Sequence, residues 1–271
     1  RACGVDRPAG EKGFCGAGNR LQVAAFAVHR GEEPPLSGTC GSGNIFFTGC
    51  SLACIFCQNY PVSRLGTGRA LSPDDLAREM LRLQDRGVHN INLVTPTPWI
   101  PQILEALAAA RDGGLTLPIV FNSGGYESVG TLALLEGAVD IWLPDMKYGS
   151  DGRAWRFSRA PHYGEVNRLA VTEMARQTGS LDTDGEGIAC RGVLVRHLVL
   201  PGGVGDTAAV LLSLKEIGGG LPLSLMFQYF PAWRAVGHPV LGRRLWIEEC
   251  LIVEKLLDGM PEIEGWKQDY G

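Results

Sequence analysis

Short apolar segments alternate with helical patterns along most of the sequence, and this alternation restricts the fold more than any other feature. The predicted strands are Asn44–Thr48, Asn90–Thr95, Pro118–Ser123, Val139–Lys147, Val193–Val199 and Leu223–Tyr229. A helical pattern follows each strand, at residues 72–87, 101–112, 128–136, 164–176, 207–217 and 242–257. Strands that alternate with helices indicate a parallel sheet with covered faces.

The number of strand–helix units predicts an open barrel. A complete eight-unit barrel takes about 250 residues, whereas the region from residue 44 to 271 offers six units. We therefore predict an α/β fold, an incomplete (β/α)6 barrel over 44–271. Residues 1–43 are rich in Cys and Gly and are predicted to form a small N-terminal extension. Functional residues are expected at the carboxyl ends of the strands.

Three cysteines follow the first predicted strand with the spacing C-x3-C-x2-C: Cys50, Cys54 and Cys57. Thiolates are the usual ligands of iron–sulfur clusters. Three of them leave one iron open to a ligand that is not protein, as a catalytic zinc keeps one open position. The alternative is a zinc site completed by a fourth ligand from elsewhere in the chain.

The surrounding sequence resembles a known enzyme family. The string SGTCGSGNIFFTGCSLACIFCQNY, with HRGEEPPLSG running into its first residues, is similar to the radical SAM superfamily. Within it the chain resembles the pyruvate formate-lyase activating enzyme-like branch, and there an uncharacterised group of activating enzymes. The resemblance implies a [4Fe–4S] cluster on the triad that chelates S-adenosylmethionine (SAM) and cleaves it reductively to methionine and a 5′-deoxyadenosyl radical. That radical would abstract hydrogen from a substrate.

The resemblance also places the contacts with SAM at the cluster loop and the strand ends. The implied residues are Phe56, Gln58, Asn59, Thr95, Thr97, Asn122, Ser123, Asp145, Lys147, Arg196 and Gln228. The turn at Thr95 and Thr97 replaces a Gly-Gly-Glu-Pro-like turn of the family and could simply end the strand. Asp145 and Lys147 point the same way in a strand, so a structural ion pair is the alternative to contact with SAM.

Arg196 suits capture of the SAM carboxylate, whereas the next residue should have another role. Arg is suited to bidentate binding of carboxylates. Because neighbouring strand residues face opposite ways, His197 is expected to be a structural histidine.

Further cysteines lie outside the triad. Cys3 and Cys15 could be half of an accessory zinc or iron–sulfur site, or two unpaired thiols. The chain begins at Arg1 rather than Met, so we expect further sequence upstream, where the resembling group carries more cysteines. Cys190 and Cys250 are predicted to be buried, inert thiols.

Composition excludes several functions. Net charge is −4, which disfavours nucleic acid as a partner, and no segment is apolar enough to span a membrane. Eight cysteines in a core-rich chain without a signal peptide indicate metal binding in the cytoplasm rather than a disulfide scaffold. The sequence lacks a G-x-G-x-x-G loop after the first strand, which argues against a methyltransferase without cluster chemistry.

Partners and substrates follow from the resemblance. It implies an electron donor such as flavodoxin or ferredoxin, and its branch suggests a glycine of a glycyl radical enzyme as substrate. A peptide or a small metabolite would suit the same core. The non-enzymatic alternative is an iron–sulfur electron carrier, in which cysteine would ligate every iron.

Overall fold

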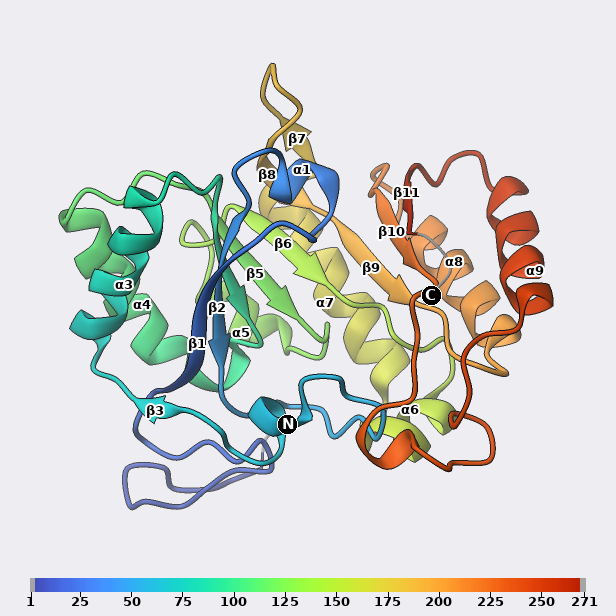
Figure 1. The fold of residues 1–271 in the computed structure, drawn as a ribbon, viewed down its shortest axis with the longest axis horizontal. Coiled ribbons are helices and arrows are strands. Elements are labelled where there is room, and N and C mark those ends of the chain that lie inside the picture. Colours follow the sequence, from blue (N-terminus) through green and yellow to red (C-terminus); the bar gives the residue numbers. More distant parts are fainter. Residues whose placement is uncertain (1–2, 269–271) are drawn as a thin grey trace.

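The computed structural model describes residues 3–268, and its centre is a curved wall of parallel strands (Figure 1). One sheet has the order β3-β1-β2-β4-β5-β6-β8-β7 and a second the order β11-β10-β9. The parallel strands are β2 (Ser42–Phe47), β4 (Ile91–Val94), β5 (Ile119–Ser123), β6 (Ile141–Pro144), β8 (Ala189–Val193), β9 (Val195–Leu198), β10 (Leu223–Met226) and β11 (Gly265–Lys267).

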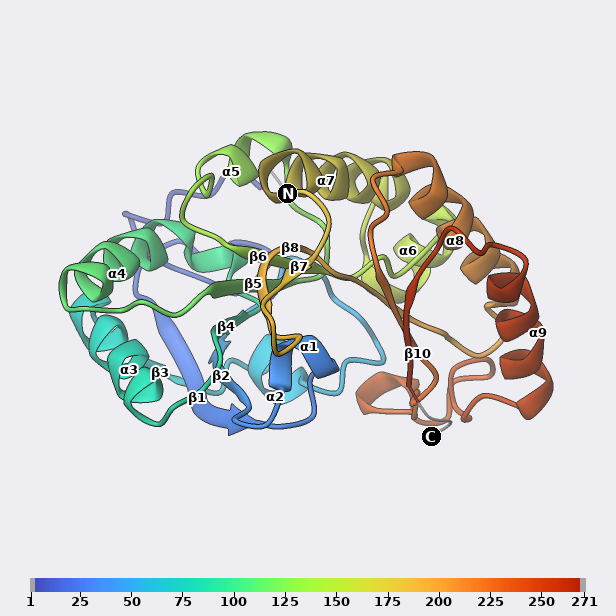
Figure 2. The ribbon, with the colours of Figure 1, turned by 90° about the horizontal axis from the view of Figure 1, so that it is seen from above.

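The two sheets continue into one another. A bridge between Asp145 and Arg196 joins the end of β6 to β9, and only Leu194 separates β8 from β9. Figure 2 shows that the wall bends into an arc whose inner side stays open. The predicted incomplete α/β barrel is confirmed.

Helices cover the outer side of the arc (Figure 2). They are α3 (Pro73–Asp85), α4 (Ile100–Asp112), α5 (Val129–Ala133), α7 (Tyr163–Thr178), α8 (Val204–Ile217) and α9 (Ile247–Asp258). The first of them shows why they form where they do: Ser72 and Asp75 form a capping box, and Leu76, Met80 and Leu83 give a buried stripe. Among the described residues, no helix has the length and apolarity needed to cross a membrane.

The two faces of the wall differ in polarity. On β2 and β4, Ile45, Ile91 and Leu93 pack in the core beneath the helices. Asn44 and Asn92 alternate with them and are also buried, so they point toward the barrel interior. The barrel interior is therefore lined with polar side chains that are not part of the apolar core beneath the helices.

Several elements differ from the sequence-based expectation. The apolar stretch at residues 21–28 is β1 (Gln22–His29), which pairs antiparallel with β2, and β3 (Arg69–Ala70) pairs with β1. The strand predicted over 193–199 begins earlier and is interrupted, because β8 turns from β6 toward β10 at Leu194. The boundary at residue 43 between extension and barrel stays a prediction.

Four short elements were not predicted: α1 (Pro34–Ser37), α2 (Tyr60–Ser63), α6 (Asp151–Ser158) and β7 (Asp182–Thr183). The strand β11 was also missed. The last helix begins at Ile247 rather than near 242, because the Glu249 carboxylate accepts the Trp246 N–H at 2.9 Å and closes the first turn there.

Candidate active site

The loop that carries the three cysteines joins β2 to α2 at the carboxyl end of the wall (Figure 1). Two backbone hydrogen bonds attach it to the end of α6, from Ala53 N to Ser158 O at 2.9 Å and from Ile55 N to Phe157 O at 2.8 Å. On its other side, Cys50 N donates to Cys15 O at 3.2 Å. The loop is therefore held by one helix of the barrel and by the N-terminal extension.

The three thiols lie in one partly buried place. Cys50 Sγ accepts the Leu52 N–H at 3.4 Å, Cys54 Sγ accepts the Ser158 hydroxyl at 2.8 Å, and Cys57 Sγ lies 3.2 Å from Ser63 Oγ. Burial, followed by the neighbouring thiols, raises the pKa of Cys50 to about 12. Burial also raises the pKa of Cys54 to about 11. Thiolates crowded in this way need bound cations, and an all-thiolate donor set is what iron–sulfur clusters use.

The zinc alternative requires ligands that converge on one ion at about 2.3 Å from each sulfur. Within residues 3–268, no three His, Cys, Asp or Glu side chains are grouped to hold a single metal ion. Cysteine thiolates are the usual ligands of iron–sulfur clusters. The donor set of the triad fits such a cluster.

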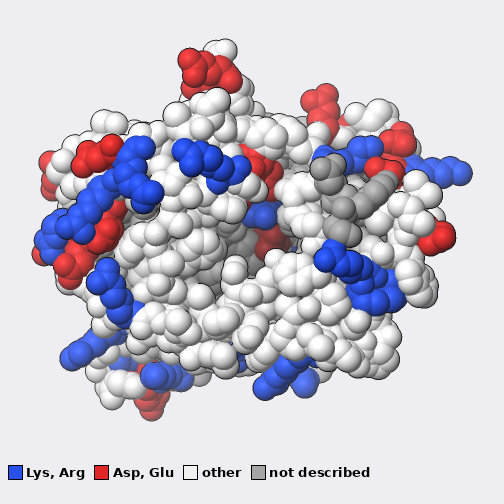
Figure 3. All heavy atoms as spheres, viewed as in Figure 1, with Lys and Arg blue, Asp and Glu red and all other residues white. Residues whose placement is uncertain are grey.

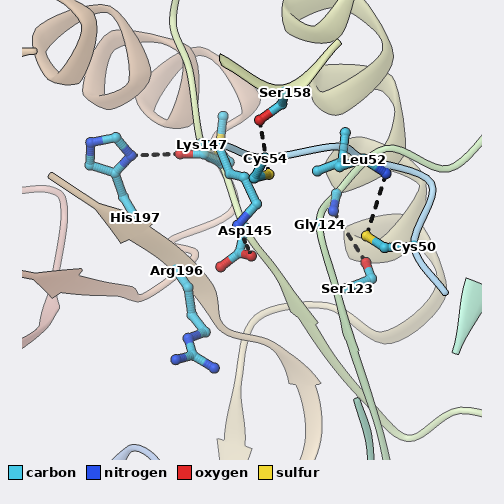
Figure 4. A network of polar contacts seen from close by, with 12 residues as sticks. Cys50, Leu52, Cys54, Ser123, Gly124, Asp145, Lys147, Ser158, Arg196 and His197 are labelled. Carbon is cyan, nitrogen blue, oxygen red and sulfur yellow. Dashed lines mark hydrogen bonds and ion pairs between the residues drawn. The ribbon is translucent and has the colours of Figure 1, made fainter. Parts of the chain in front are cut away.

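Asp145 and Lys147 form an ion pair beside the thiols, with Nζ and Oδ2 2.5 Å apart (Figure 4). Burial alone would lower the pKa of Lys147, but its pairing with Asp145 and the nearby thiols Cys54 and Cys50 raise it above the ordinary value. The pair predicted as the alternative to SAM contact is thus formed. It places a fixed ammonium next to the position where cluster thiolates would carry negative charge.

Gly125 lets the ends of β5 and β6 approach α7. A Cβ on Gly125, where φ is +64°, would lie 2.2 Å from both Asn167 Nδ2 and Asp145 O. Asn167 Nδ2 donates to Gly125 O at 2.8 Å and to Asp145 O at 2.9 Å. Tyr163 OH reaches Gly124 O at 2.9 Å in the same region. Side chains of α7 therefore fix the geometry of two strand ends.

A buried carboxylate connects the end of β5 with the turn that follows β4. Glu127 accepts the hydroxyls of Thr97 at 2.8 Å and Ser123 at 3.0 Å, and burial raises its pKa. Thr95, at the end of β4, has a φ of 58°, which is strained for a β-branched residue and typical of functional sites. The predicted residues Thr97 and Ser123 are thus brought together around Glu127, and Thr95 lies two residues before Thr97.

The other predicted SAM residues are more scattered. Phe56 is buried, with its ring centroid 6.1 Å from that of Tyr229. Gln58 and Asn59 are exposed, and Asn59 caps α2 with its backbone. The two remaining residues have nearby partners: Asn122 O accepts Thr95 N at 2.8 Å, and Gln228 Nε2 donates to Gln268. Their contacts with SAM stay predictions.

Arg196 and His197 leave β9 in opposite directions (Figure 4). His197 is buried, with Nδ1 2.6 Å from Met146 O and Nε2 2.9 Å from Thr207 Oγ1, and burial lowers its pKa to about 4. It is a structural residue, as predicted. The Arg196 guanidinium points away from the cysteine loop (Figure 4) and pairs with Glu32 and Glu33, in the segment before α1. Its predicted contact with the SAM carboxylate stays a prediction.

The structure brings Cys3 and Cys15 to the same glycine. A Cβ on Gly13 would lie 3.2 Å from Cys3 Sγ and 3.4 Å from Cys15 Sγ. Arg7 Nη2 donates to Cys15 Sγ at 3.3 Å. The Phe14 N–H is the main cause of a lowered pKa at Cys3. Neighbouring thiols with N–H donors suit a metal site, and the accessory site stays a prediction.

Two isolated cysteines differ from one another. Cys250 is buried in the core, as predicted. The prediction for Cys190 is wrong: it is exposed, because it lies on the edge of the β7–β8 hairpin rather than under a helix.

Sequence reasoning missed the residues that support the site from other elements: Glu127, Ser158, Tyr163 and Asn167. It also missed Glu32 and Glu33, which pair with Arg196. The Gly124-Gly125 pair signalled a close approach, although not its partner. The two adjacent acids before Pro34 could have indicated a functional segment, but they lie outside the strand–helix pattern on which the prediction was based.

The chain has recognisable relatives. A model of the radical SAM superfamily matches residues 44–202, more than half of the chain. The uncharacterised protein MJ0674 of Methanocaldococcus jannaschii is 30% identical over 267 residues, which are 94% of this chain and 71% of that protein.

Solved structures share the fold at low identity. Streptococcus suis SuiB bound to the precursor peptide SuiA matches with a TM-score of 0.58 and 11% identity, over 81% of this chain and 46% of SuiB. The protein anSMEcpe with bound SAM matches with a TM-score of 0.54 and 10% identity, over 80% of this chain and 61% of its own. The chain thus spans about half the length of SuiB. At this identity the likeness shows the fold of the barrel.

Proposed function

The chain belongs to the radical SAM superfamily, and from this premise we propose that it is an enzyme that cleaves SAM reductively. We propose Cys50, Cys54 and Cys57 as ligands of a [4Fe–4S] cluster. When bound, this group supplies an electron to SAM and so generates a 5′-deoxyadenosyl radical that abstracts hydrogen. The observation that carries the proposal is the convergence of three thiols beside Lys147, at the carboxyl ends of the strands.

The residues around the triad have roles that follow from their contacts. The Leu52 N–H and the Ser158 hydroxyl donate to thiol sulfurs, and such hydrogen bonds adjust the potential of a cluster. Lys147 offsets part of the negative charge of the thiolates, because it lies within electrostatic range of Cys50 and Cys54. The attachment of the loop to α6 keeps the thiols in place when the cluster changes charge.

SAM is proposed to lie across the strand ends next to the loop. Thr95, Thr97, Asn122 and Ser123 come from two neighbouring strand ends, and the strain at Thr95 supports a ligand-facing turn there. Phe56 would contribute its backbone and ring, and Asp145 and Lys147 their charges. Gln58, Asn59, Gln228 and Arg196 complete the proposed set of SAM contacts. Arg196 has the weakest support among them, because its guanidinium already contacts Glu32 and Glu33.

The finer proposal concerns the substrate. The likeness of the cysteine region to activating enzymes supports hydrogen abstraction from a glycine of a glycyl radical enzyme, with an electron donor such as flavodoxin or ferredoxin. The hollow on the face of the molecule that Figure 3 shows supports access for a peptide loop. The second candidate, a small metabolite or a peptide side chain, is favoured by the charged barrel interior described below.

A spectroscopic titration tests the cluster and SAM together. The reconstituted, reduced protein should contain about four irons per chain, and addition of SAM should change its EPR signal. Cys57→Ala should lose the cluster, whereas Cys250→Ala, the control substitution of a thiol in the core, should keep it. A cluster that forms normally in Cys57→Ala, or a signal that SAM leaves unchanged, would count against the proposal.

A further inference from the structure

A second group of polar side chains lies inside the barrel, on the side away from the cysteine loop. Glu32 and Glu33 precede α1 and meet Asn44 of β2, Asn92 of β4 and Arg196 of β9. We call these five residues the interior acid cluster. Its members come from distant parts of the chain, since Glu32 and Arg196 are 164 residues apart.

The contacts within the cluster centre on one carboxylate. Glu32 Oε1 accepts Nδ2 of Asn44 at 2.8 Å and Nδ2 of Asn92 at 3.3 Å. Glu32 Oε2 lies 3.4 Å from Arg196 Nη1. Arg196 Nε lies 3.2 Å from Glu33 Oε1, but the N–H is not directed for a hydrogen bond.

Buried polar atoms without hydrogen-bond partners concentrate in this cluster. Of the eight such atoms in the described residues, five belong to it: Glu33 Oε1, Glu33 Oε2, Asn44 Oδ1, Asn92 Oδ1 and Arg196 Nε. Each buried polar group left without a partner costs about 1–3 kcal/mol. Such a concentration in one place indicates a site that a ligand completes.

The chemistry of the unpaired atoms specifies the ligand. Asn44 and Asn92 both donate a hydrogen bond from Nδ2 to the Glu32 carboxylate, which can only accept hydrogen bonds. Their Oδ1 atoms therefore remain without a hydrogen-bond donor. With the two oxygens of Glu33, four of the five cluster atoms without a hydrogen-bond partner are acceptors, and one is a donor. The ligand must therefore bring mainly N–H or O–H donors.

The charge of the cluster points the same way. Two carboxylates share one guanidinium, so the cluster has one negative charge in excess. Glu33 and Asn92 are both fully buried. A buried carboxylate requires a positive partner or a donor. An ammonium group satisfies both the charge and the acceptors.

Solvent reaches the cluster at Arg196 and Glu32, and Asp145 links the cluster electrostatically to the triad. Figure 3 shows that this face of the molecule is hollowed and that acidic and basic atoms lie inside the hollow. The side chain of Arg196 is 20% exposed and that of Glu32 is 8% exposed. Asp145 interacts electrostatically with both Arg196 and Cys54, so it links the cluster to the proposed reaction site.

We propose that the interior acid cluster recognises a protonated amine on the substrate, with Glu33 as the counter-ion and Asn44 and Asn92 as hydrogen-bond acceptors. The reaction performed on that substrate rests on the proposed function, whereas the binding does not. A free alkylamine and a lysine side chain share this chemistry.

Ligand-observed NMR with three probes of equal length tests the proposal. Butylammonium, butanol and butyrate differ in charge at one end only, and each is added to the reconstituted full chain at fixed ionic strength. Butylammonium should bind, with the other two at least about tenfold weaker, as expected for one charge-assisted contact. Glu33→Gln, which keeps the shape of the side chain, should weaken butylammonium binding about tenfold. Glu136→Gln, an exposed carboxylate paired with Arg176, should leave it unchanged.

N-acetyl-lysine methylamide then separates the two sources of the amine: tighter binding than butylammonium assigns a peptide side chain, and weaker binding a free amine. Binding of butyrate, no binding of any probe, or butylammonium binding that survives Glu33→Gln would each overturn the proposal. Should Glu33→Gln not fold, the three probes on the unaltered chain still decide. Loss of SAM cleavage with amine binding intact would instead overturn the proposed function alone.

Discussion

Single side chains adjust the charge of the thiol group from outside the cysteine loop. Ser158 donates its hydroxyl to Cys54 Sγ at 2.8 Å, and Tyr148 OH lies 2.5 Å from the same serine oxygen. A donor to a ligand sulfur stabilises the more negative, reduced state of a cluster. The serine is therefore expected to raise the reduction potential.

Ser158→Ala should lower the reduction potential of the cluster while cluster assembly is kept. EPR-monitored redox titration of the reconstituted protein measures the change. Ser213→Ala, on α8 away from the loop, is the matched control and should leave the potential in place. A potential equal in all three proteins would show that the contact has no electrostatic effect.

His197 makes stability depend on pH. Burial lowers its folded-state pKa to about 4, compared with about 6.5 for an exposed histidine in the unfolded chain. The unfolded chain therefore binds a proton more readily than the folded one. Stability is complete above pH 6.5 and falls as pH drops toward 4. The loss at pH 5 relative to pH 7 is about 2 kcal/mol from this residue. Urea denaturation should show a smaller loss in His197→Gln, and an equal loss would refute the assignment.

At the level of elements, α7 holds the ends of β5 and β6 through Tyr163 and Asn167. Gly125→Ala would force a Cβ against the Asp145 carbonyl as well as Asn167. Strain at positive φ together with overpacking should cost about 3 kcal/mol. Gly137→Ala shares the positive φ, at +78°, but meets nothing within 4 Å, and should cost about 1 kcal/mol. Equal values in denaturation experiments would contradict the close approach.

The N-terminal extension contacts the cysteine loop through Cys15 O and Cys50 N. Cys3→Ala should reduce any metal bound in addition to the four-iron cluster and should leave SAM cleavage largely intact, because no described contact joins Cys3 Sγ to the triad. Elemental analysis measures the metal, with Cys40→Ala, an exposed thiol, as control. Complete loss of SAM cleavage would make the extension part of the active site.

The whole molecule shows which features the sequence can predict. Alternation of strands and helices predicted the open barrel, because each helix needs a strand face to cover. The rule that parallel sheets bind ligands at their carboxyl ends then placed Cys50 and Asp145 at one edge. These inferences depend on local patterns, which a single sequence contains.

Long-range contacts were not predictable in this way. Ser158 reaches Cys54 across 104 residues, from a helix of eight residues that includes Gly152 and so has a weak helical pattern. Glu32 and Glu33 enter the interior from a short segment outside the strand–helix repeat. Their partner Arg196 was assigned to SAM from the family pattern, and only the three-dimensional structure shows the two carboxylates beside it.

The central claim is that the triad directs reductive cleavage of SAM. The most direct measurement is 5′-deoxyadenosine by mass spectrometry, after the reconstituted protein is incubated anaerobically with dithionite and SAM. The account predicts 5′-deoxyadenosine from the unaltered chain and none from Cys54→Ala, which lacks the thiol that Ser158 contacts. Absence of 5′-deoxyadenosine from protein with a full cluster and bound SAM, or equal amounts from Cys54→Ala, would contradict it.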